Sequence, residues 1–301
     1  MKEKAFSIGY LILAVLVLGL TACAGPQTKD FAEFANSGIR FTEQTPKVYD
    51  YAFRQEVNAD SAKIISNREL PGASGELLAE SLEGKNTEFL RRLDDFNLMK
   101  KHAILMRSYF MVLGKLASGE NTEEAGNAAA SIANQMENLV PQITKVAVLG
   151  KSVTGLLQPF TKITVGAVTN AALKKHLEQH GDSIRKAIDL QREMFQILRN
   201  IEIEQDEIAW KQRAKLILEK PLKNLKNDLP ANWSEQRLAL LTVSPAETPL
   251  SAALQATQEL QENLRSLALN QGSTIDRLER SILWMNALID AFEKVQGGAK
   301  P

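Results

Sequence analysis

Apolar residues recur at intervals of three and four along most of the chain, which is the spacing of an α-helix with one buried face. The clearest example covers residues 75–118, where a seven-residue repeat joins Leu82, Phe89, Leu93, Phe96, Ala103, Phe110, Leu113 and Ala117. A strand would place successive residues on opposite faces, so this repeat predicts a long helix with one apolar, coiled-coil-like seam. The sequence Ser118-Gly119-Glu120-Asn121 predicts the end of that helix.

The next segment, residues 125–160, alternates steps of four and three: Ala125, Ala129, Ile132, Met136, Leu139, Ile143, Val146, Gly150, Val153, Leu157 and Phe160. This pattern predicts a second long helix. Pro141 and Pro159 interrupt it chemically, because a proline inside a helix removes one backbone hydrogen bond and crowds the preceding turn. We therefore expect a kink or break near each proline.

Three further helices are predicted in the second half of the chain. One begins at about residue 182 and ends near Pro221, and another carries leucines between residues 250 and 267. The last follows a turn at Gln271-Gly272, where Ser273 and Asp276 resemble a capping box, and carries apolar residues from Ile275 to Phe292. Residues 221–249 form a proline-rich polar connection with one anchoring candidate, Trp233.

Near the N-terminus, Thr45-Pro46 is a favourable helix start, because proline at the first helical position costs no hydrogen bond. We expect a helix from there to about Leu70, where Pro71-Gly72 follows, and a short helix over residues 30–40 within a lead-in that ends at residue 46. The predicted fold is all-α, an elongated antiparallel helical bundle of long amphipathic helices. Residues 47–301 form its domain, with a sub-boundary within 221–249 as an alternative.

The first 22 residues have a different pattern. A charged start, Met1 to Lys4, precedes an apolar run of about 16 residues, shorter than the roughly 20 that cross a membrane. These are the parts of a secretory signal peptide, 1–22. The run ends in Leu20-Thr21-Ala22-Cys23, which resembles the lipobox of bacterial lipoproteins. The resemblance implies cleavage before Cys23, a diacylglyceryl group on its sulfur and acylation of the new N-terminus with a chain such as palmitate.

Cys23 is the only cysteine of the chain, and lipidation accounts for it without a disulfide. More than one acyl chain makes such an anchor stable. Residues 23–46 then serve as lipidated cysteine, tether and lead-in. Ala24 follows Cys23, whereas aspartate at that position marks retention in the inner membrane of Gram-negative bacteria. The resemblance therefore implies an outer-membrane lipid anchor with the body in the periplasm, and surface display is the alternative.

Charge excludes one class of partner. Of 36 basic and 36 acidic residues, the signal peptide carries Lys2, Lys4 and Glu3, so the mature chain has a net charge of −1. Proteins that bind nucleic acid are typically strongly basic over a domain or stripe. We therefore expect no nucleic-acid partner.

No recognisable catalytic site stands out. His176 and His180 are four residues apart and share a helix face, so they are a candidate zinc pair, but only Asp182 offers a third ligand nearby. Gly181 favours another interpretation, a helix end where histidine interacts with the helix dipole. His102 follows Lys100-Lys101 and is expected to be solvated or partly buried. We predict a protein that is not an enzyme and has no cofactor besides its lipid.

Residues 146–173 are rich in Gly, Thr, Val and Ala. They loosely resemble the apolar head of helical pore-forming toxins, which implies as an alternative a membrane-active protein that inserts 146–173. The favoured interpretation is a buried hairpin, because no uncharged run reaches the length of a membrane span. The main expectation is a lipid-anchored structural or partner-binding component of the cell envelope. Its oligomeric state does not follow from the sequence.

Overall fold

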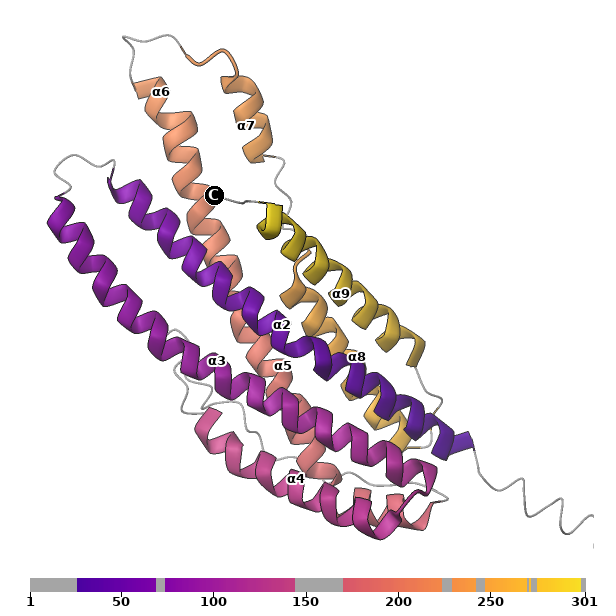
Figure 1. Cartoon of the computed structure of the whole chain (residues 1–301). Helices are drawn as coiled ribbons and strands as arrows, with labels where there is room; N and C mark the ends of the chain where they lie inside the picture. The colour runs from indigo at the N-terminus through magenta and orange to yellow at the C-terminus, as the bar shows by residue number, and fades with distance from the viewer. Residues whose placement is uncertain are drawn as a thin grey trace, which may run out of the picture.

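The computed structural model describes residues 26–68, 74–143, 170–223, 229–241, 247–269, 271 and 275–298. All elements in these ranges are helical, which confirms the predicted fold class. They are α2 (Pro26–Arg68), α3 (Gly75–Ser118), α4 (Thr122–Ile143), α5 (Ala171–Ala214), the π-helical turn η1 (Lys215–Glu219), α6 (Lys220–Lys223), α7 (Trp233–Leu241), α8 (Pro249–Ala268) and α9 (Ile275–Gly298). Figure 1 shows an elongated bundle in which α2 and α3, α3 and α4, and α8 and α9 run antiparallel.

Helix α2 differs from the prediction, because one helix replaces the lead-in and the separate helix after Pro46. The segment 26–46 is part of the core rather than a tether, since Phe31, Phe34 and Phe41 are fully buried. A proline inside a helix costs about 3 kcal/mol. Burial of each phenylalanine side chain contributes roughly 1.5–3 kcal/mol, so packing on both sides of Pro46 outweighs that cost.

Helix α3 has the predicted bounds, and its end has the predicted cause. Gly119 adopts a left-handed conformation with φ of 79°, and its N–H donates back to the carbonyl of Leu116. Only part of the seam is buried. From Phe96 to Ala117 the seam residues lie in the core, whereas Leu82 is 44% exposed. The N-terminal half of α3 therefore extends past the core.

Helix α4 does not break at Pro141 but continues to Ile143, with Ala125, Ala129 and Met136 buried as predicted. Helix α5 begins eleven residues before the predicted start, at Ala171. Asn170 caps it, because its side-chain oxygen accepts from the N–H groups of Ala172 and Leu173. Asp182 and Ser183 therefore do not begin the helix.

Two prolines shape the C-terminal third. Pro221 lacks the N–H that would bond the carbonyl of Ile217, and its ring crowds that carbonyl, so the preceding turn widens into η1. Pro249 instead begins α8, where Thr248 forms a capping box with Ser251. The predicted Ser273 cap lies outside the described residues.

The core lies between α2 and its neighbours. Helix α2 packs along α3 on one side and against α5, α8 and α9 on the other. Aromatic rings fill the centre: Tyr49 lies 5.4 Å from Phe195 and 6.4 Å from Phe96 between ring centroids. Within the described ranges, no helix is both long and apolar enough to cross a membrane.

Candidate functional site

The two histidines of the candidate zinc pair lie side by side on α5, with ring centroids 4.9 Å apart. The helix does not end at Gly181, which corrects the expectation of a helix end. Gly181 is buried and continues a stripe formed by Leu173, Leu177 and Ile184. The pair therefore lies within α5, near its N-terminal end, and the buried His176 faces the neighbouring helices.

His176 is 5% exposed, and its Nε2 shares a hydrogen bond of 2.7 Å with the hydroxyl of Tyr109 on α3. Burial lowers the pKa of His176 to about 4, and the neighbouring His180 acts in the same direction. The ring is therefore neutral at pH 7. Among the described residues, no group of three His, Cys, Asp or Glu side chains is placed to hold a metal ion. Nε2 of His176 is instead hydrogen-bonded to Tyr109.

His102 is fully buried, which corrects the expectation of a solvated or partly buried side chain. Its Nδ1 lies 3.3 Å from Oε1 of Gln191, and Nε2 of Gln191 donates to the hydroxyl of Tyr49 at 2.5 Å. Since the amide oxygen only accepts, His102 carries its proton on Nδ1. Its Nε2 is buried without a hydrogen-bond partner, and burial lowers the pKa of His102 to about 4.

A second polar cluster joins three elements at Glu202 of α5, which is 5% exposed. Tyr51 of α2 donates to one carboxylate oxygen, and Thr248 and Arg199 donate to the other, at 2.9 Å and 2.5 Å. Since Thr248 also caps α8, this cluster fixes where α8 begins relative to α2 and α5. Both polar clusters hold helices in register.

Comparison with protein-family models, with curated proteins and with solved structures finds no match to this chain. We therefore infer the site of action from the exposed residues of the chain itself.

The most unusual surface is a helical hairpin beyond the core, which we call the distal arm and define as residues 203–223 and 229–241. Among the described helices, α7 contacts only α5 and η1. Nε1 of Trp210 donates to the carbonyl of Leu240 at 2.9 Å and ties α7 to α5. In Figure 1 the arm projects at the opposite end of the bundle from the start of α2.

Half of the large apolar side chains that are exposed in the described ranges lie on this arm. They are Ile203, Ile208, Trp210, Leu222, Leu229, Leu238 and Leu241, with exposed fractions between 40% and 62%. Single exposed leucines are normal on protein surfaces, whereas a concentration of them marks an interaction site. Sequence analysis singled out Trp233 in this region, but periodicity alone could not show that the arm lies outside the core.

The remaining sequence candidates do not gather into a site. The lipidation residue Cys23 lies outside the described residues, and so does the candidate insertion segment, except for residues 170–173 at the start of α5.

Proposed function

We propose that the mature chain is a lipid-anchored, periplasm-facing helical protein that acts by binding another envelope protein through its distal arm. The observation that carries the proposal is the concentration of exposed apolar side chains at the end of the molecule opposite the start of α2. An anchor at Cys23, three residues before α2 begins, directs this arm away from the membrane. The continuous helical segment 171–223 spans roughly 80 Å at 1.5 Å per residue, so the arm reaches well beyond the lipid headgroups.

The geometry of the arm favours a helical partner. Two antiparallel helices bury only the faces that meet each other, and both helices of the arm keep apolar side chains on their other faces. An amphipathic helix from the partner would lie along both and complete a three-helix unit. Each leucine buried in that interface contributes roughly 1.5–3 kcal/mol, so Leu238 and Leu241 together account for a large part of a micromolar affinity.

Site-specific photo-crosslinking in living cells tests the arm. A photoreactive residue at Leu241 is expected to capture a discrete protein, and the same residue at Ile104 of α3 is not. The two positions are matched in exposure, at 61% and 57%. Leu238→Glu in the Leu241 probe strain is expected to abolish the crosslink. A crosslink of equal yield at Ile104, or recovery of the chain as an isolated species from every arm position, would contradict the proposal.

The anchor is tested separately with Cys23→Ser. The wild-type chain is expected to incorporate labelled palmitate and to fractionate with the outer membrane. The variant is expected to incorporate no label and to keep residues 1–22, because processing of such signals depends on the modified cysteine. Label in the variant, or a mature N-terminus at another residue, would show that the lipobox assignment is wrong. The arm is probed by crosslinking and the anchor by labelling. One experiment can therefore contradict the role of the arm, or the lipid anchor, without affecting the other.

A further inference from the structure

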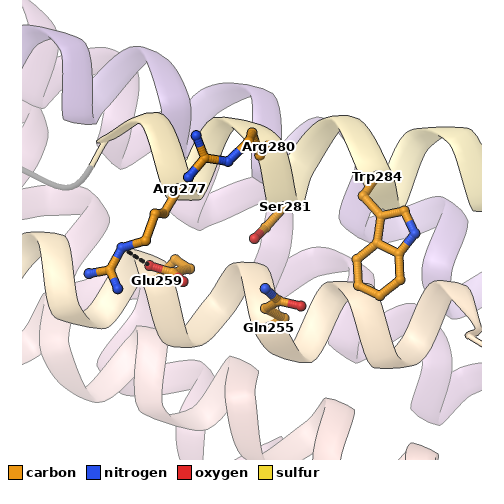
Figure 2. A pocket seen from close by; sticks show the side chains of 6 residues that line it. All are labelled: Gln255, Glu259, Arg277, Arg280, Ser281 and Trp284. Carbon is orange, nitrogen blue, oxygen red and sulfur yellow. Dashed lines mark ion pairs between the residues drawn. The ribbon is translucent and has the colours of Figure 1, made fainter.

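A shallow groove lies between α8 and α9, on the body of the bundle rather than on the arm. It has a volume of about 270 Å³ and is lined by Gln255 and Glu259 of α8 and by Arg277, Arg280, Ser281 and Trp284 of α9. Figure 2 shows Trp284 at one end of the groove and the Arg277–Glu259 ion pair at the other. The groove thus has the apolar indole ring of Trp284 at one end and charged side chains at the other.

Two polar side chains face the groove. Ser281 is 4% exposed, its hydroxyl has no hydrogen bond to a described residue, and in Figure 2 it points from α9 toward α8. Oε2 of Glu259 is buried and accepts no hydrogen bond, although Nε of Arg277 forms an ion pair with it at 3.5 Å. A buried acceptor without a hydrogen bond costs about 1–3 kcal/mol, so a ligand that donates to Glu259 would recover part of that free energy, and the hydroxyl of Ser281 can hydrogen-bond the same ligand.

The geometry points to a saccharide as the ligand of this groove. Glu259 requires a hydrogen-bond donor and disfavours an anionic group beside it, whereas Ser281 and Gln255 can both donate and accept. Sugar hydroxyls provide donors and acceptors on one edge of a ring, and the C–H face of the same ring is apolar and packs on Trp284. The volume is below the range of about 300–1,000 Å³ typical of sites for drug-sized ligands, so the groove holds one sugar unit rather than an extended chain.

The guanidinium of Arg280 has no ion-pair partner among the described residues, and it lies on the rim of the groove. A carboxylate on the far side of the sugar from Glu259 would bind it. An acidic sugar is therefore expected to bind at least as well as a neutral one.

The test uses the full chain in micelles of a detergent without a sugar headgroup. Cellobiose, diacetylchitobiose and digalacturonic acid are titrated separately, with saturation-transfer NMR on the sugar and tryptophan fluorescence of the protein as readouts. At least one disaccharide is expected to saturate the protein with a millimolar dissociation constant. Trp284→Phe should remove the fluorescence response, whereas Trp210→Phe, far away on the arm, should retain it.

Two substitutions with little effect on folding decide whether the groove is the site. Gln255 is exposed on α8, and Gln258 is exposed on the same helix without lining the groove. Gln255→Ala and Ser281→Ala are each expected to weaken binding by about threefold or more, and Gln258→Ala to leave it unchanged. The inference is overturned if no disaccharide binds, or if all three variants bind as the wild type does. Either result leaves the proposed role of the distal arm unaffected.

Discussion

Acid should destabilise this protein through the buried histidine of α3. In the unfolded chain His102 titrates near its ordinary pKa of 6.5, whereas in the folded protein burial lowers that pKa to about 4. The unfolded state therefore binds more protons than the folded state between these two values. The contribution of neutral His102 to the free energy of unfolding is fully present above pH 6.5 and is lost as the pH decreases toward 4. The gap between the two pKa values corresponds to about 3 kcal/mol, a large fraction of the stability of a typical domain.

The cause of this effect is local. Protonation would place a charge on Nε2, which is buried and has no acceptor, while Nδ1 is already occupied by Gln191. His102→Met removes the titrating group and keeps an apolar side chain of comparable length in the core. It also leaves Oε1 of Gln191 without its donor, which costs about 1–3 kcal/mol at pH 7.5. At pH 7.5 the variant should therefore have a lower free energy of unfolding than the wild type. On acidification to pH 4 it should lose about 3 kcal/mol less of that free energy than the wild type loses.

Urea unfolding followed by circular dichroism at several pH values between 7.5 and 4 measures both quantities. Met106→Leu is the matched control, because Met106 is buried on the same helix and does not titrate. Its free energy of unfolding should change with pH as that of the wild type does. His176, whose pKa is also lowered to about 4, adds to the acid sensitivity and remains in both variants. Parallel profiles for the wild type and His102→Met between pH 6.5 and 4 would refute the reasoning.

Three further predictions concern the helices that carry these clusters. Gly38→Ala should destabilise the protein by about 1–3 kcal/mol in urea, because its Cβ would lie 2.6 Å from the ring of Phe110, whereas Gly126→Ala, with open space around it, should gain up to about 1 kcal/mol. Asn170→Ala should cost about 0.5–2 kcal/mol through loss of the α5 cap, in addition to the loss of its amide's donation to the carbonyl of Leu116, and Asn170→Ser, which loses that donation but keeps a capping oxygen, should cost less; equal losses would exclude capping as the cause. Thr248→Val should lower the melting temperature through loss of the α8 cap and of a bond to Glu202, whereas Thr87→Val, whose hydroxyl is exposed on α3, should not.

The periodicity of apolar residues predicted the long helices, but not α7, which lies in the segment 221–249 that was predicted as a polar connection. It predicted α3 correctly because the seam, the loop at Gly119 and the helix-forming composition agree with one another. The local rules failed at Pro46, where they predicted a helix start, and at Gly181, where they predicted a helix end. In both places the residues on either side are buried along one stripe, so tertiary packing outweighs the local preference. A single sequence does not show which of its seams meet, and for that reason it could not show that packing.

The polar clusters were missed for a related reason. His102, Gln191 and Tyr49 occupy buried positions of α3, α5 and α2, but a pattern of apolar residues gives no sign that three polar side chains will meet. Sequence analysis therefore predicted a solvated or partly buried His102, because two lysines precede it. The groove between α8 and α9 was missed as well, since Gln255, Ser281 and Trp284 belong to no motif and converge only when the two helices pack.

These buried polar contacts have a consequence for how the bundle is specified. Helices about 65 Å long, such as α2 and α3, carry seams whose apolar positions repeat, so sliding one helix by a full repeat would bury a similar amount of apolar surface. The hydrogen bonds from His102 through Gln191 to Tyr49 form in only one register, and any slide would leave three buried polar side chains without partners. At about 1–3 kcal/mol for each lost partner, the wrong registers are disfavoured by several kcal/mol. The polar clusters thus select one register among those that the apolar seams permit, and the same register places the arm at one end of the molecule and the start of α2 at the other.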